Sequence, residues 1–502
     1  MKYQNPVIPG FYPDPSVCRA GGDYYLVTSS FEYFPGVPVF HSRDLVHWRQ
    51  IGHCLTRRGQ LDLEGVPSSC GIYAPTIRYH AGRFYMTTTN VTRGGNFYVW
   101  TEDPGGEWSE PIWVDQGGID PSLFFDDDGR VYFTSNGGGD ERGIYQCEIE
   151  IATGRRLTES RYIWSGTGGA YPEAPHLYKI NGLYYLMIAE GGTEYGHMET
   201  IARSAGPYGP FEPCPYNPIL SHRSLDSPIQ ATGHADLLQA HDGSWWLYFL
   251  GIRPVSYPPC HHLGRETFLS PVSWHEGWPL VGENGHTSLE VEAALPPSVL
   301  WPSPPVRDDF DAPILDMSWN FLRNPHAEDW SLTDRPGWLR LTGSAVTLDE
   351  AASPAFIGRR QQHFDCRAGA LLDFEPRLDG EEAGLTVLMN ERHHYEIAVT
   401  RLDGEKSIIV RRRIGSLAMV VAKAAVADGP VVLGIDADPS RYRFIFHQGE
   451  GEPKTLAEGE TRYLSKEVAG GFTGVYFGLY ATGNGKRSTA PAYFDWFAYE
   501  GG

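Results

Sequence analysis

The sequence predicts an all-β protein in which a five-bladed β-propeller is followed by a C-terminal antiparallel β-sandwich. Three observations predict this fold. A short apolar segment, a glycine turn and an aromatic-rich segment recur together five times before residue 300. After residue 307 this combination stops, and short segments alternate apolar and polar residues instead. No long segment has the 3.6-residue periodicity that would indicate a helix.

The five repeats are marked by the glycine in each turn. Each glycine follows the start of its repeat by eight or nine residues and precedes an aromatic-rich segment, so each repeat is expected to form a β-hairpin. The spacings of 60, 47, 53 and 61 residues are typical of a repeat architecture, and five hairpin units suggest five blades. These glycines are Gly22, Gly82, Gly129, Gly182 and Gly243.

Four of the five repeats begin with a titratable residue, or have one immediately before the start: Asp14, Asp120, Glu173 and His234. If equivalent positions of the blades face the central axis, three carboxyl groups and one imidazole converge there. Like charges in a shared site cost free energy and move pKa values apart. In a single repeat, Asp-Pro-Ser is best explained as a turn. Three carboxyl groups in register instead indicate an active site.

The chain divides into two domains at a proline-rich segment. Residues 1–300 hold the repeats and are expected to form the propeller. The segment 296–306 contains five prolines and resembles a stiff linker. Residues 307–502 are expected to form the sandwich, because runs such as 395–399 and 442–446 alternate apolar and polar side chains.

Composition excludes several classes of partner. The net charge of −21 argues against nucleic acid and against an anionic membrane surface. No run of about 18 apolar residues could span a membrane, and the amino terminus lacks the apolar region of a signal peptide. The seven cysteines are dispersed and never in Cys-x-x-Cys spacing, which indicates free thiols in a cytoplasmic protein.

The three carboxyl groups match the needs of glycosidic bond hydrolysis. One carboxylic acid protonates the leaving oxygen, and a second carboxylate activates water or attacks directly. Glu173 has the longer side chain, which suits the acid that must reach the leaving group. A neighbouring negative charge would raise its pKa so that it stays protonated near neutral pH, and Asp120 is expected to supply that charge.

Six segments then carry a resemblance to a known family. They are residues 5–16, 30–38, 118–122, 173–178, 232–236 and 264–267. In motif order, in spacing and in the appended sandwich, the chain resembles glycoside hydrolase family 43 of the β-xylosidase and α-L-arabinofuranosidase type. The resemblance implies hydrolysis with inversion, with Asp14 as general base, Glu173 as general acid, and Asp120 tuning and orienting the acid.

The same resemblance assigns residues that bind the sugar. Arg265 resembles the family's active-site arginine, although a lone arginine is usually a surface residue or half of an ion pair. Phe31 and Tyr73 resemble the aromatic walls of the sugar pocket, although such aromatics are core residues in most propellers. The Tyr73 position is tryptophan in some relatives, so the sugar preference stays open. Phe472, in the segment 471–474, resembles the tip of a sandwich loop that closes one side of the pocket.

His234 resembles an axial histidine that helps to hold a calcium ion in many relatives. Calcium prefers oxygen ligands, and one imidazole defines no metal site. A polar plug hydrogen-bonded through water is the alternative for His234. No organic cofactor is expected.

These observations predict an inverting exo-β-1,4-xylosidase that releases xylose from the non-reducing ends of xylo-oligosaccharides, with α-L-arabinofuranosidase as a second activity. A primary arabinofuranosidase acting on arabinose-bearing oligosaccharides is the first alternative. A sugar-binding propeller without turnover is the second, and the sandwich could also bind sugar on its own. The acidic surface permits a homo-oligomer without requiring one.

Overall fold

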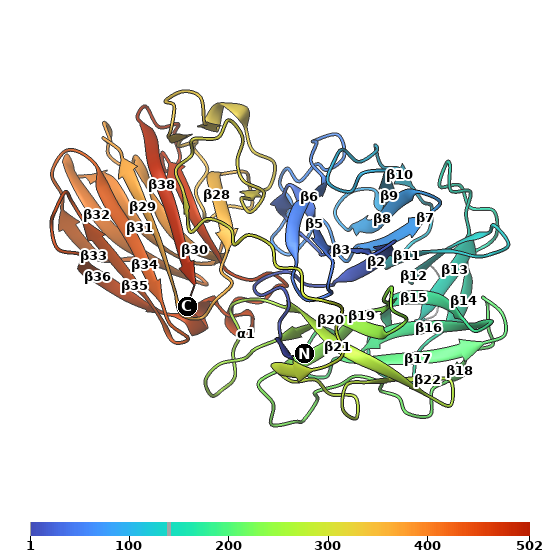
Figure 1. Cartoon of the computed structure of the whole chain (residues 1–502). Helices are drawn as coiled ribbons and strands as arrows, with labels where there is room; N and C mark the ends of the chain where they lie inside the picture. The colour runs from blue at the N-terminus through green and yellow to red at the C-terminus, as the bar shows by residue number, and fades with distance from the viewer. Residues whose placement is uncertain (1, 138–141, 502) are drawn as a thin grey trace.

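The computed structural model describes residues 2–137 and 142–501. These residues form two all-β domains that lie side by side, with the sandwich in yellow to red and the propeller in blue to green (Figure 1). The predicted fold is confirmed. The helical elements of the described residues are single turns, namely η1 (Ala327–Asp329), η2 (Thr461–Leu464) and α1 (Lys466–Ala469). None of them is long or apolar enough to cross a membrane. The seven cysteines are unpaired.

The propeller consists of five antiparallel four-stranded sheets. The first strand of each sheet packs against the first strand of the next, and β19 packs against β2 to close the ring, so the five first strands surround the axis. Blade 1 contains β2 (Ser16–Ala20), β3 (Asp23–Val27), β5 (Gly36–Ser42) and β6 (Arg49–Leu55). Blade 2 contains β7 (Thr76–His80), β8 (Arg83–Asn90), β9 (Gly95–Thr101) and β10 (Ile112–Trp113). Blade 3 contains β11 (Ile119–Phe125), β12 (Val131–Asn136), β13 (Ile144–Glu148) and β14 (Arg161–Trp164). Blades 4 and 5 contain β15 (Glu173–Ile180), β16 (Leu183–Glu190), β17 (Met198–Ser204) and β18 (Glu212–Pro213); β19 (Gln230–Gln239), β20 (Trp245–Ile252), β21 (Glu266–His275) and β22 (Trp278–Val281).

Glycine makes the turn between the first and second strands of every blade. Gly82, Gly129, Gly182 and Gly243 have φ values of 82° to 87°, in the left-handed region that glycine enters without steric cost. In blade 1 this conformation belongs to Gly21, one residue before the predicted glycine. The ends of the domain are joined where β1 (Lys2–Gln4) pairs with β23 (Glu290–Glu292).

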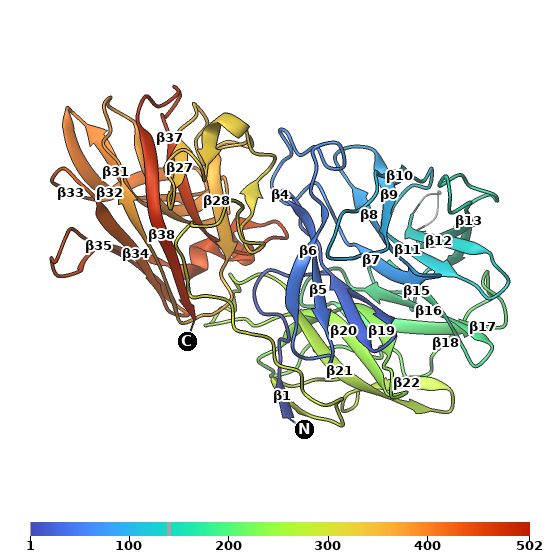
Figure 2. The ribbon, with the colours of Figure 1, turned by 45° about the horizontal axis from the view of Figure 1, so that its top comes forward.

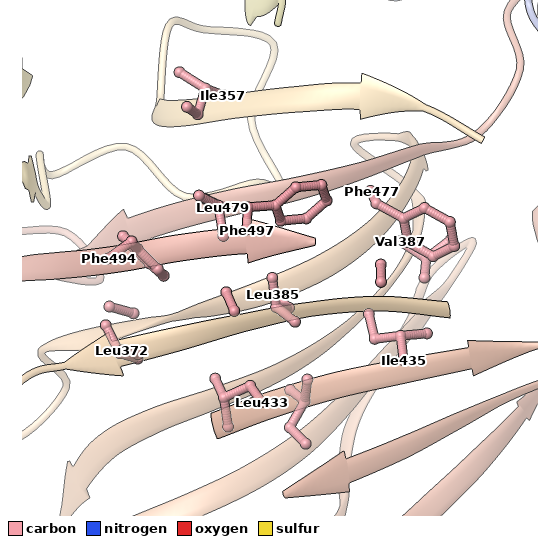
Figure 3. Close-up of a cluster of buried hydrophobic side chains, with 14 of the residues drawn as sticks. Ile357, Leu372, Leu385, Val387, Leu433, Ile435, Phe477, Leu479, Phe494 and Phe497 are labelled. Atoms are coloured by element: carbon pink, nitrogen blue, oxygen red, sulfur yellow. The ribbon is translucent and has the colours of Figure 1, made fainter. Parts of the chain in front are cut away.

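The second domain is a sandwich of an eight-stranded and a six-stranded sheet. Side chains alternate along its strands, so that Leu433 and Ile435 are buried between the sheets while Gly434 faces the other way. Figure 3 shows this core, to which Leu385 and Phe494 contribute from other strands. The eight-stranded sheet contains β24 (Arg307–Asp308), β26 (Trp330–Ser331), β27 (Leu339–Thr342), β38 (Pro491–Gly501), β29 (Cys366–Asp373), β34 (Val431–Ala437), β35 (Arg441–His447) and β36 (Lys454–Glu460). The six-stranded sheet contains β28 (Ala355–Arg360), β37 (Tyr476–Thr482), β30 (Glu382–Asn390), β31 (His393–Leu402), β32 (Glu405–Ile414) and β33 (Leu417–Ala425).

The two domains share a strand pairing and an apolar cluster. β4 (Tyr33–Phe34) of the propeller pairs with β25 (Phe321–Leu322) of the following domain, at the contact between the two domains (Figure 2). Phe11 and Phe31 of the propeller belong to the same buried cluster as Tyr476 of the sandwich. This contact places the sandwich beside the end of the propeller axis at which the predicted site residues lie.

Candidate active site

Four blades share an unusual backbone conformation where their first strands begin. Asp14, Asp120, Ala174 and His234 have φ values between 52° and 56°, a left-handed conformation that is uncommon for residues other than glycine. The strand pairing is irregular at this point in β11, β15 and β19. In blade 4 the equivalent position is occupied by Ala174, so Glu173 lies one residue before the register of the other carboxylates.

All eight predicted site residues line one cavity of about 90 Å³. Three further residues complete its wall: Ala74, Ile119 and Thr193. The predicted residues come from all five blades and from the sandwich, and they are Asp14, Phe31, Tyr73, Asp120, Glu173, His234, Arg265 and Phe472. The structure therefore brings the predicted residues together, and their roles stay predictions.

Asp14 is held as a carboxylate. It is 3% exposed, and burial by itself would raise its pKa. Arg265 donates from Nη1 to Asp14 Oδ1 at 2.8 Å, and the Ser29 hydroxyl donates to Oδ2 at 2.5 Å. His234 Nδ1 lies 3.7 Å from Oδ1. These neighbours together lower the pKa of Asp14 below its ordinary value.

Glu173 has the opposite shift. Burial, followed by the negative charge of Asp14, raises the pKa of Glu173 to about 7, while Arg265 acts in the lowering direction. Burial and the charges of Glu173 and Asp14 also raise the pKa of Asp120 well above its ordinary value. The carboxyl groups of Asp120 and Glu173 act on each other, and the role of Asp120 in raising the pKa of Glu173 stays a prediction. Asp120 Oδ2 accepts the backbone N–H of Ala174 at 3.3 Å, and through it holds the segment that carries Glu173.

Three aromatic rings form one side of the cavity, and two of them lie against the Arg265 guanidinium. The rings of Phe31 and Phe472 are stacked with their centroids 6.1 Å apart, and Tyr73 lies 5.4 Å from Phe31. The guanidinium carbon lies 5.7 Å from the centre of the Phe31 ring and 5.8 Å from that of Phe472. Arg265 also donates to Thr193 Oγ1 at 3.1 Å, so it is fixed on several sides.

The sandwich delivers Phe472 through a tight contact with the propeller. The Phe472 backbone N–H donates to Ser69 Oγ at 2.8 Å. A Cβ on Gly471 would lie 2.4 Å from that oxygen, and Gly471 has φ of 79°, so only glycine fits there. Lys466 of α1 donates from Nζ to the Thr193 carbonyl at 3.0 Å and lies 5.7 Å from the centre of the Phe472 ring. Both domains thus contribute to the wall of the cavity.

Comparison with known proteins decides the family. Residues 3–279 match the model described as Glycosyl hydrolases family 43, and residues 307–500 match the model described as Beta xylosidase C-terminal Concanavalin A-like domain. The chain belongs to glycoside hydrolase family 43. It is therefore an enzyme, and the suggestion of a propeller without turnover is set aside.

Individual relatives cover nearly the whole chain. The chain is 47% identical to the "Non-reducing end alpha-L-arabinofuranosidase BoGH43B" of Bacteroides ovatus, over 99% of this chain and 94% of that protein. It is 39% identical to the "Xylosidase/arabinosidase" of Butyrivibrio fibrisolvens, over 99% of both. The solved structure titled "Bacteroides ovatus Xyloglucan PUL GH43B" has a TM-score of 0.96 at 46% identity, with both chains fully covered.

Sequence reasoning missed the residues that support this family 43 site. Ser29, Ser69 and Lys466 hold Asp14 and the Phe472 segment, but none occupies a repeated position. Thr193 lies next to Gly191-Gly192, beyond the end of β16. The two glycines after a strand were an available signal for a loop with a special conformation, but not for a contact with Arg265.

The described side chains around His234 do not provide the set of ligands that a calcium ion needs. Calcium prefers six to eight oxygen ligands. In the part of the chain that the structure describes, no group of three or more His, Cys, Asp or Glu side chains is placed to hold a metal ion. Burial lowers the pKa of His234, while the charge of Asp14 acts in the raising direction. Calcium at His234 stays a prediction of the sequence.

Proposed function

We propose that this family 43 enzyme is an inverting, exo-acting glycosidase that removes one terminal pentose, with β-1,4-xylosidase as its first activity. The observation that carries the proposal is the opposite protonation of two carboxyl groups that line one cavity. Asp14 is kept ionised while Glu173 is kept protonated up to a pH of about 7. A general base and a general acid are the two groups that single displacement requires.

In the proposed reaction, a water molecule attacks the anomeric carbon and gives its proton to Asp14. The bond between that carbon and the leaving oxygen breaks, and Glu173 gives its proton to that oxygen. Asp120 keeps Glu173 in place through the Ala174 N–H. Arg265 is bonded to Asp14 and fixes the direction of the base. Asp14 ends protonated and Glu173 ionised, so one proton must return through solvent between turnovers.

Exo attack follows from the shape of the cavity. Its small volume of about 90 Å³ and the position of Phe472 in its wall favour a terminal sugar over a chain that passes through. Xylo-oligosaccharides and arabinose-bearing oligosaccharides are the substrates that we propose. An α-L-arabinofuranosidase activity is a second candidate, because the 47% identical relative carries that name.

The test compares two leaving groups in the Glu173→Gln variant. The kcat on xylobiose should fall by orders of magnitude, because its alkoxide leaving group needs protonation. The kcat on an aryl xyloside with a good leaving group should fall much less. An equal loss on both substrates would contradict the role of Glu173 as general acid. Measuring kcat/KM of the unmodified enzyme on 4-nitrophenyl β-D-xylopyranoside and α-L-arabinofuranoside ranks the two candidate activities.

A further inference from the structure

A guanidinium group lies on the axis of the propeller, below the active site. Arg78 belongs to β7 of blade 2. It donates from Nη1 to Ser16 Oγ of blade 1 at 3.2 Å and to Asp236 Oδ2 of blade 5 at 2.7 Å. From Nη2 it donates to His176 Nδ1 of blade 4 at 2.7 Å. Because blade 3 separates blades 2 and 4 in the ring, one side chain contacts all of these strands only near the axis.

The partners of Arg78 form the layer next to the catalytic residues. Ser16, His176 and Asp236 each lie two residues after a residue with the left-handed backbone described above. Asp236 Oδ2 accepts the Ser16 hydroxyl at 2.6 Å and the Val17 backbone N–H at 3.0 Å. The Arg78–Asp236 pair therefore holds the segment that directly follows the catalytic base.

The carboxylate of this pair has no capacity left for a metal ion. Asp236 is fully buried. Besides the donors already named, it accepts the Tyr178 hydroxyl at 2.6 Å on Oδ1, which also accepts Arg78 Nη2 at 3.2 Å. The His176 Nδ1 lone pair faces the same guanidinium. A divalent cation placed here would be repelled by Arg78 and would find two of the available donors already bonded.

We propose that Arg78 is a positioning residue that supplies the positive charge of the axis in place of a divalent cation and, through Asp236, holds the segment that carries Asp14. The catalytic effect of this role rests on the proposed function of Asp14. The replacement of a divalent cation by Arg78 does not rest on that function, and metal content and melting temperature test it without turnover.

The first test uses the unmodified enzyme. After dialysis against a chelator and then against calcium chloride, elemental analysis should find far less than one calcium per chain. The melting temperature and kcat should be the same in chelator and in calcium. One tightly held calcium per chain, or a melting temperature that rises with calcium, would overturn the proposal. Absence of activity on every glycoside would contradict the proposed function while leaving the metal content and the melting temperature as valid tests.

The second test removes the charge. Arg78→Met keeps most of the volume but leaves Asp236 buried and unpaired, so the melting temperature should fall by at least about 5 °C. The kcat should fall about tenfold to a hundredfold with little change in KM, because the base is misplaced. Calcium should raise the melting temperature of this variant, since the buried charge of Asp236 then lacks its cationic partner.

Two further variants control this test. Arg78→Lys retains the charge and should recover part of the stability and of kcat without responding to calcium. Arg130→Met removes an arginine whose side chain is 58% exposed and should behave like the unmodified enzyme. An Arg78→Met protein with unchanged melting temperature and kcat would overturn the proposal. If the Arg78→Met protein does not fold, the Arg78→Lys protein provides the test. A melting temperature of Arg78→Lys that rises with calcium would then overturn the proposal.

Discussion

The hydroxyl of Ser29 is predicted to set the acidic limit of activity, and Ser29→Ala tests this. The hydroxyl donates to Asp14 Oδ2 at 2.5 Å and is one of the contacts that lower the pKa of Asp14. A hydrogen bond to a charged group contributes about 1.5 to 3 kcal/mol. Since one pKa unit corresponds to about 1.4 kcal/mol, losing this bond should raise the pKa of Asp14 by about one to two units. Arg265 stays in place, so the base still forms at neutral pH.

The assay is the pH profile of kcat/KM on 4-nitrophenyl β-D-xylopyranoside. The base must be ionised and the acid protonated, so activity falls on the acidic side through the pKa of Asp14 and on the alkaline side through that of Glu173, at about 7. Ser29→Ala should move the acidic limb upward by about one to two units and leave the alkaline limb in place.

The neighbouring residue gives a matched control for this variant. Thr28 is also fully buried, but its hydroxyl has no hydrogen-bond partner among residues 2–137 and 142–501. Thr28→Val should therefore leave both limbs unchanged. An acidic limb that is the same in Ser29→Ala and in the unmodified enzyme would refute the assignment of Asp14 as a base held by this hydrogen bond.

Three other predictions concern the closing loop and the sandwich. Phe472→Ala should lower kcat/KM on xylobiose, mainly by raising KM. The control Val468→Ala, at a residue of α1 that is 47% exposed, should leave both constants unchanged. Equal kinetics in the two variants would exclude the loop from substrate binding. Leu385→Ala should lower the free energy of unfolding, measured by urea titration, by about 2 to 5 kcal/mol. Leu417 is 74% exposed, so Leu417→Ala should lower it by at most about 0.5 kcal/mol. Similar losses in the two variants would be inconsistent with the described core. Burial lowers the pKa of His394, but two neighbouring carboxylates raise it to about 9. The protonated His394 should therefore stabilise the folded protein fully below the unfolded pKa of about 6.5, and this contribution should be lost as pH rises through about 9. In His394→Gln the melting temperature should fall less steeply as pH rises through this range. A decline as steep as in the unmodified enzyme would contradict this role of His394.

The repeat made most of the fold and the axial part of the site predictable. Each blade repeats its glycine turn, so Asp14, Asp120 and His234 could be aligned before any coordinates existed. Glu173 is displaced by one residue, because Ala174 occupies the equivalent backbone position. The motif included Glu173, but periodicity alone would have pointed to the alanine.

The parts that sequence reasoning missed depend on contacts across the fold. Ser29 acts through a hydrogen bond whose geometry no spacing encodes. Lys466 meets the Thr193 loop only because the sandwich packs beside the propeller. Arg78 lies in the middle of β7, four residues before the turn glycine Gly82, and resembles any polar residue of a strand. Only the closed ring brings it to the axis.

The most direct test of the account is the stereochemistry of the first product. Proton NMR of the enzyme mixed with xylobiose, recorded during the first minutes, shows which anomer of xylose is released before mutarotation. We expect α-xylose, because water activated by Asp14 attacks the face opposite the bond that Glu173 protonates. β-Xylose as the first product would mean retention, and would contradict the assignment of Asp14 as a general base for water.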